Sequence, residues 1–225
     1  MMTQGKRSIL AAHSKAKTRQ TMYHGERWNS VTHLLGLALS VVGSAVLIAQ
    51  AAHGGDTLKI ISFSIFGLSM IVLYGASSLY HSVKGVSKAQ WAKVDHCAIY
   101  VLIAGTYTPF TLVTLHGTLG WSLFAFVWVL ALIGIGKELW WGRETVPSVP
   151  LYVLMGWCGL AAASQLMEGL HEQGWMWLLA GGLLYTVGII FYVLDKRLRH
   201  AHGIWHLFVL GGTASHYFTV LKFVA

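Results

Sequence analysis

The chain has 225 residues, of which 55% are hydrophobic and only 11% are charged. A soluble domain of this size carries roughly 25% charged residues, so this composition excludes an ordinary soluble globular protein. The formal net charge of +8 would suit a nucleic-acid-binding protein, but no polar segment is long enough to fold into a binding surface, and we expect no nucleic-acid partner.

Apolar runs of about 20 residues recur along the chain, the length that a helix needs to cross roughly 30 Å of hydrocarbon. Seven runs are predicted to span the membrane, and they cover residues 30–52, 58–81, 94–115, 119–138, 151–167, 175–194 and 203–224. We therefore predict an all-α, polytopic membrane protein. A basic segment, residues 1–29, precedes a seven-helix bundle at 30–225.

The positive charges predict the orientation of this bundle. Lys and Arg favour the cytoplasmic side of short loops. With seven spans, 14 of the 16 Lys and Arg residues fall on one side, and only Lys59 and Lys222 fall on the other. The amino terminus is therefore predicted to be cytoplasmic and the carboxyl terminus outside. An error in the number of spans would scramble this alternation.

Polar residues that are unusual in membrane helices gather at the predicted cytoplasmic ends of four spans. Ionisable residues inside spans are costly and are by default functional candidates. The set comprises Glu26, Asn29, Thr32 and His33 in the first span or just before it, Ser77 and His81 in the second, Asp95 and His96 in the third, and His202 and His206 in the seventh. The alternation of the helices places all of these residues at one depth.

The spacing of His202 and His206 predicts a metal site. Residues four apart on a helix differ by about 6 Å of rise and about 40° of rotation, so both imidazoles can reach one ion. His81 would supply a third nitrogen from a neighbouring helix. Three histidines on zinc leave a fourth position open, as in catalytic zinc sites. Asp95 would hold a water there, and Ser77, one turn before His81, would donate to the site.

A single histidine at a helix end is more often an interfacial residue than a ligand. The metal hypothesis depends on the set, because three helices bring such residues to one depth. Glu26 and Asn29 are candidates for the surroundings of the metal. His33 is expected to line the cavity or to hydrogen-bond to one of them. His96 should point about 100° away from Asp95 around the helix, which places it outside the metal's immediate contacts.

Two further polar residues lie deeper in the predicted bundle. His216 follows His202 by 14 residues, which places it about 21 Å further along the helix and too far to share the metal. It would line a cavity or pair with a polar group such as Tyr107. Tyr107 lies in the segment "GTYTPF", where Pro109 is expected to kink the third span.

Four segments resemble the bacterial hemolysin III proteins, which belong with the progestin and adiponectin receptor family and are distantly similar to alkaline ceramidases. The segments are "ERWNSVTH", "SSLYHS", "VDH" and "HGIWHLFVLGGTASHYF". The resemblance implies seven helices with a cytoplasmic amino terminus and a location in the inner membrane of a bacterium. It also implies zinc ligands at His81, His202 and His206, a water-holding acid at Asp95, and the family serine at Ser77.

Three functions remain open at this point. The first is a zinc-dependent hydrolase of a lipid amide or ester, with Asp95 as general base and Ser77 stabilising the developing negative oxygen. The second is a non-enzymatic regulator or sensor of membrane state, such as fluidity or energetics, in which zinc is structural. In both, a membrane lipid is the expected substrate or ligand. The third is a cytolysin-like pore, for which the spans offer few polar residues beyond Tyr107 and His216.

Overall fold

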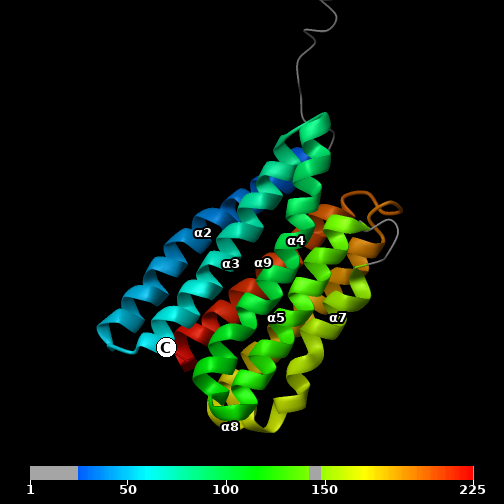
Figure 1. Ribbon diagram of the computed structural model, residues 1–225. Coiled ribbons are helices and arrows are strands. Elements are labelled where there is room, and N and C mark those ends of the chain that lie inside the picture. The colour runs from blue at the N-terminus through cyan, green and yellow to red at the C-terminus, as the bar shows by residue number, and fades with distance from the viewer. Residues whose placement is uncertain (1–24, 142–147, 225) are drawn as a thin grey trace, which may run out of the picture.

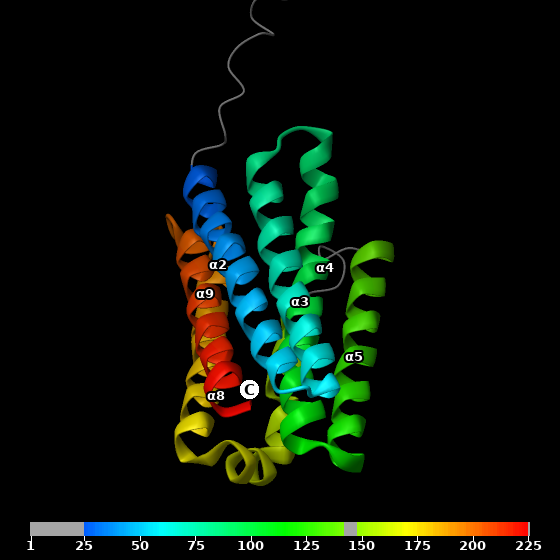
Figure 2. The same cartoon turned by 90° about the vertical axis from the view of Figure 1, so that its left-hand side faces the viewer.

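The computed structural model describes residues 25–141 and 148–224, and all regular secondary structure in this part of the chain is helical (Figure 1). Most of the predicted basic segment 1–29 and part of the loop after the fourth predicted span lie outside the described residues. The helices are packed side by side as a bundle, with successive long helices running in opposite directions (Figure 2).

The helices follow one another with short connections. In chain order they are α2 (Glu26–His53), α3 (Thr57–Ser82), α4 (Val86–Pro109), the π-helical η1 (Phe110–Leu115), α5 (Gly117–Trp140), α7 (Val149–Trp157), the 3₁₀ segment η2 (Cys158–Ala162), α8 (Ala163–Val193), α9 (Ala201–Thr219) and the π-helical η3 (Val220–Val224).

Six helical segments of the described chain are long and apolar enough to cross a membrane, which supports the prediction of an all-α, multi-pass membrane protein. One of them, Val149–Val193, has 45 residues, far more than the about 20 residues a crossing needs. The backbone of His171 leaves the helical region there, with φ 56° and ψ 172°. The predicted spans 151–167 and 175–194 lie on either side of this break, where the chain crosses the lower end of the bundle (yellow in Figure 2).

Two helices begin earlier than the apolar runs predicted. α2 begins at Glu26, so the last residues of the predicted segment 1–29 belong to the first helix. α4 begins at Val86, eight residues before the predicted start of the third span. Hydropathy marks where a helix enters hydrocarbon, whereas the helix itself continues as long as its backbone hydrogen bonds are made. Both extensions bring polar residues next to the end of α3.

At Pro109, where a kink was predicted, the helix changes type. α4 ends at Pro109 and the chain continues as the π-helical η1. Proline has no N–H to donate to the preceding turn. Nearby threonine hydroxyls donate to main-chain carbonyls, as Thr108 does to Ala104 at 3.0 Å and Thr111 does to Tyr107 at 3.0 Å.

Small residues let α3 and α4 approach closely. A Cβ added to Gly105 in α4 would lie 2.5 Å from the Cβ of Ser69 in α3, so this contact exists only with glycine. In membranes, where lipid is as apolar as the helix surface, such close approach is the usual source of helix association. The contact fixes the position of α3, which carries Ser77 and His81, against α4, which carries Asp95.

Candidate metal centre

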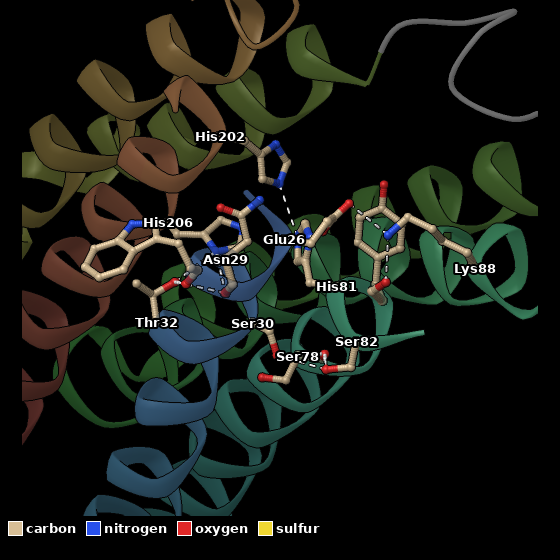
Figure 3. A network of polar contacts seen from close by, with 12 residues as sticks. Glu26, Asn29, Ser30, Thr32, Ser78, His81, Ser82, Lys88, His202 and His206 are labelled. Atoms are coloured by element: carbon tan, nitrogen blue, oxygen red, sulfur yellow. Dashed lines mark hydrogen bonds and ion pairs between the residues drawn. The ribbon is translucent and has the colours of Figure 1, made fainter. Parts of the chain in front are cut away.

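Three histidines meet at the end of the bundle where α3 ends and α9 begins. His81 is in the last turn of α3, and His202 and His206 are in the first turns of α9. One ring nitrogen of each lies within 4.8 Å of the others. The Nε2 atoms of His81 and His202 are 3.3 Å apart (Figure 3). His81 and His206 are buried and His202 is partly exposed. The structure thus brings together the three predicted ligands, and they could hold a metal ion.

His81 is held from behind by an ion-pair chain. Its Nδ1 contacts the Glu26 carboxylate, the first residue of α2. The other oxygen of that carboxylate pairs with Nζ of Lys88 at 2.9 Å (Figure 3). Lys88 also donates to the carbonyl of Tyr80 at 3.0 Å and lies 4.2 Å from the centre of its ring. The start of α4 therefore holds Glu26 against the imidazole at the end of α3.

The other two imidazoles also have a partner at Nδ1. Nδ1 of His202 lies 3.2 Å from a carboxylate oxygen of Asp195, in the turn between α8 and α9. Nδ1 of His206 lies 3.1 Å from the main-chain carbonyl of Asn29 and 3.2 Å from the hydroxyl of Thr32. In each case an acceptor is available for a hydrogen bond that a protonated Nδ1 would donate.

These partners leave the Nε2 atoms free for a cation. When Nδ1 carries the proton, Nε2 has only a lone pair. Two such lone pairs facing each other at 3.3 Å repel unless a cation or a proton lies between them. Histidines that bind metals typically donate their other nitrogen to a carboxylate or a carbonyl. The cluster therefore fits a metal ion, and imidazole donors suit zinc, copper, iron and nickel.

A cavity of about 1080 Å³, measured out to its opening, adjoins the histidines. His202 and His206 line it, as do Asp95 from α4 and Ser77 from α3, both buried. The predicted water-holding acid and serine thus share one cavity with two of the predicted ligands. Away from the histidines, most of the lining comes from aliphatic and aromatic side chains.

The surroundings of the cluster differ in part from the prediction. His33 lines the cavity, as expected, and stacks on His206 with ring centres 3.6 Å apart. Of the two alternatives for His33, the structure thus shows cavity lining and not the hydrogen bond, because neither ring nitrogen of His33 has a partner among the described residues. Stacking and burial, which the sequence does not encode locally, decide its position. His96 also lines the cavity.

The two deeper residues also line the cavity. Nε2 of His216 lies 3.0 Å from the carbonyl of Leu178, and the hydroxyl of Tyr107 donates to the carbonyl of Gly156 at 2.9 Å. Each side chain thus bonds to the main chain of a neighbouring helix, and no bond joins the two. Of the two alternatives for His216, the structure places it on a cavity wall.

Asp195 and Lys88 were not among the predicted site residues. Lys88 counted only as one of the basic residues of its loop. Asp195 is an isolated acid next to the basic run "KRLRH", and it precedes His202 by seven residues. A single acid in an otherwise positively charged loop indicates that it pairs with a nearby basic side chain. The sequence could not identify His202 as that side chain, because the distance between them depends on the turn between α8 and α9.

Comparison with known proteins places these residues in a family. A family model described as "Haemolysin-III related" matches residues 21–217. The chain is 43% identical over 210 residues to "Hemolysin-3" of Bacillus cereus, and the aligned region covers 92% of this chain and 95% of that protein. It is 45% identical over 195 residues to "Hemolysin-3 homolog" of Bacillus subtilis (strain 168), which covers 86% and 91%. The chain belongs to the haemolysin-III related family.

The match to the haemolysin-III family confirms the resemblance that the four segments predicted. The chain is also 30% identical over 206 residues to the human "Monocyte to macrophage differentiation factor", which covers 87% of this chain and 83% of that protein. Residues 21–217 include every residue of the histidine cluster and its Nδ1 partners. The haemolysin-III part of the chain is therefore also the part that carries the candidate metal centre.

Proposed function

We propose that this haemolysin-III protein is a zinc-dependent hydrolase of a lipid amide or ester, with His81, His202 and His206 as the metal ligands. The observation that carries the proposal is the arrangement of the three imidazoles beside a cavity that also holds an acid and a serine. Each Nδ1 has an acceptor, the Nε2 atoms of His81 and His202 face each other, and one ring nitrogen of each histidine lies within 4.8 Å of the others. A site that only tied helices together would not need that cavity.

Zinc, when bound, would polarise the scissile carbonyl and make hydroxide available near neutral pH. Asp95 would orient the attacking water, take its proton and pass that proton to the departing amine or alcohol. Ser77 would donate a hydrogen bond to the oxygen that gains negative charge. Glu26, Asp195 and Asn29 would hold the three imidazoles in the required tautomer. The apolar walls of the cavity would bind the acyl chain and exclude bulk water from the reacting bond.

Metal analysis and a hydrolysis screen test this proposal together. The purified wild-type protein should contain about one zinc per chain, and the double variant His202→Ala/His206→Ala should contain none. The wild type should hydrolyse at least one member of a panel of lipid amides and esters, while Asp95→Asn should keep its zinc and lose turnover. Zinc retained by the double variant would remove the basis of the site. Folded, zinc-loaded protein that hydrolyses nothing in the panel would rule out the hydrolase.

The second candidate is a regulator or sensor of membrane state in which zinc is structural. It is supported by the way the cluster joins α3 to α9 and, through Glu26 and Asn29, to α2. In that case His202→Ala would lower thermal stability along with function, and Asp95→Asn would change neither. The third candidate, a pore, is supported only by the names of the two Bacillus relatives, and ion flux through the purified protein in liposomes would test it.

We further infer seven crossings of a bacterial inner membrane, with a cytoplasmic amino terminus. Support comes from the Lys and Arg residues, 14 of which fall on one side of the membrane when seven spans are assumed, and from the non-helical backbone at His171, which separates two spans. In addition, the start of α2 and the end of α9 lie at opposite ends of the bundle, as an odd number of crossings requires (Figure 2). In a variant without native cysteines, His53→Cys should react with an impermeant maleimide added outside spheroplasts, and Val86→Cys should not. The reverse labelling would overturn the orientation.

A further inference from the structure

A second cavity, of about 620 Å³, lies next to the first. The two cavities share a small set of lining residues, which we call the junction. The junction consists of Thr106, Tyr107, Gly156, Trp157, Gly182 and His216. Because these residues line the first cavity as well as the second, a long ligand that starts at the histidine cluster and fills the first cavity would reach the junction.

The junction lies deep in the bundle. His206 and His216 are ten residues apart on α9, which corresponds to about 15 Å along the helix axis. A chain whose head lies at the histidine cluster would therefore reach the junction part-way along its length.

His216, a residue of the junction, has one buried ring nitrogen without a partner among the described residues. Its Nε2 lies 3.0 Å from the carbonyl of Leu178, and since a carbonyl only accepts, Nε2 carries the proton. Nδ1 is then a lone-pair acceptor, and it has no partner among the described residues. A Cβ added to Gly181 would lie 2.2 Å from Cδ2 and 2.4 Å from Nε2 of His216, so that edge of the ring is packed on α8. Nδ1 lies on the other side of the ring.

The other polar side chains of the junction have already donated their protons. The hydroxyl of Tyr107 donates to the carbonyl of Gly156 at 2.9 Å. The hydroxyl of Thr106 donates to a carbonyl of its own helix, and the indole N–H of Trp157 donates to a threonine hydroxyl. Within the described part of the chain, the junction therefore has no free side-chain donor, and Nδ1 of His216 is its one buried side-chain atom without any partner.

The donors and acceptors of the junction determine which polar group of a ligand can bind there. A buried acceptor without a partner costs free energy, which a group that donates one hydrogen would recover. A hydroxyl group does this. An amide or a carboxyl group would bring a carbonyl oxygen that finds no donor, and an ether or a ketone has no hydrogen to give. We propose that the junction binds a hydroxyl group carried part-way along an apolar chain, with Nδ1 of His216 as its acceptor.

The inference rests on the proposed function only in placing the head of that chain at the histidine cluster. The hydroxyl preference itself needs no catalysis. For the proposed hydrolase, it implies a preference for lipid substrates that carry a hydroxyl group part-way along the acyl chain.

The first test uses the purified wild-type protein and two fatty acids as probes. Each acid is titrated against a bound fluorescent fatty acid, and its displacement of the probe gives its affinity. One acid is octadecanoic acid, and the other is a hydroxyoctadecanoic acid with its hydroxyl in the middle of the chain. The hydroxylated acid should bind about 3- to 10-fold more tightly, the effect of one hydrogen bond. Isomers with the hydroxyl beside the carboxyl group or at the chain end should show no gain. Equal affinity for all isomers would overturn the proposal, as would a gain that does not depend on position.

Substitutions at the junction test whether the preference for the hydroxylated acid arises there. His216→Phe keeps a planar ring and removes the acceptor, so the preference should disappear while octadecanoic acid still binds. A Cβ added to Gly182 meets no atom within 4 Å, so Gly182→Leu should project into the junction and weaken both acids about tenfold or more. Gly75 lines neither cavity, and its added Cβ would meet only Leu37, at 3.9 Å, so Gly75→Leu is the matched control and should change neither affinity. A preference that survives in His216→Phe would contradict the assignment.

The same binding measurement with both fatty acids on metal-free protein separates this inference from the proposed function. The mid-chain preference should persist after chelation. Protein that shows the preference but hydrolyses no lipid would remove the hydrolase and leave the junction site standing. A working hydrolase that binds all isomers equally would overturn the junction site alone.

Discussion

Each histidine of the cluster depends on a residue outside it. His81 relies on Glu26, which is itself held by Lys88, and His202 relies on Asp195. The side chain of Glu26 is 16% exposed and that of Asp195 is 43% exposed. Water screens a charge interaction more strongly where the partner is exposed. The two carboxylates should therefore differ in how much they support the metal.

Lys88 is expected to position Glu26 without touching the metal. Lys88→Met should raise the Kd for zinc about tenfold, at the lower end of what is seen when supporting residues of metal sites are removed. Lys93→Met, which removes an exposed positive charge from the same helix, is the control and should leave the Kd unchanged. Competition with a chelating dye measures the Kd. Equal effects of the two variants would mean that only net charge matters.

The two carboxylates can be compared directly. Glu26→Gln should weaken zinc binding more than Asp195→Asn, because Glu26 is better shielded from water. Both amides keep the size of the side chain and remove the charge. The absorption spectrum of the cobalt-substituted protein should change more for Glu26→Gln, since it reports how the ligands are oriented. A larger effect of Asp195→Asn on both readings would contradict this ranking.

The helices that carry the site are held at fixed distances by small residues. α3 contributes His81 and Ser77, and α4 contributes Asp95, so the spacing of these two helices sets the distance from the acid to the metal. Gly105 and Ser69 set that spacing. A larger side chain at this contact would move Asp95 away from the histidines or would strain the core.

Gly105→Ala should therefore destabilise the protein by about 1–3 kcal/mol, the usual cost of overpacking. Adding Ser69→Gly in the same chain should restore part of that loss, because the added Cβ would then have room. Gly182→Ala, where the added Cβ meets open space, should be close to neutral. Thermal unfolding in detergent measures all three. An absence of coupling between Gly105→Ala and Ser69→Gly would show that this contact does not control the packing.

For the whole molecule, the histidine cluster and its partners join the first described helix, α2, to α3 and α9. α3 and α9 carry the three imidazoles, α2 carries the partners Glu26 and Asn29, and α4 supports Glu26 through Lys88. A metal that binds the folded protein and not the unfolded chain stabilises the fold by RT ln(1 + [L]/Kd), about 2.7 kcal/mol at a hundredfold excess over Kd.

Removal of the metal should consequently lower the Tm of the wild type by several degrees, and re-addition of zinc should restore it. The His202→Ala/His206→Ala variant should already have the lower Tm and should not respond to chelator or zinc. Thermal unfolding with and without chelator provides the comparison. A response of the double variant equal to that of the wild type would place the stabilising metal elsewhere.

Much of the fold was predictable because lipid imposes strict rules on a sequence. Apolar runs of spanning length predicted the helical, multi-pass architecture, and the spacing of His202 and His206 placed both rings on one face of α9. The orientation of the helices then placed His81 and Asp95 at the same depth. Local periodicity and hydropathy were enough for these conclusions, since each depends on residues close together in the chain.

Other features were decided only by tertiary contacts. The stacking of His33 on His206, the contact of Asp195 with His202 and the hold of Lys88 on Glu26 all join residues whose distances depend on turns and on helix packing. The junction around His216 depends on how four helices pack and where glycines leave space. A sequence determines which side chains share a helix face, but which side chains and empty spaces lie between helices is determined by the packed bundle.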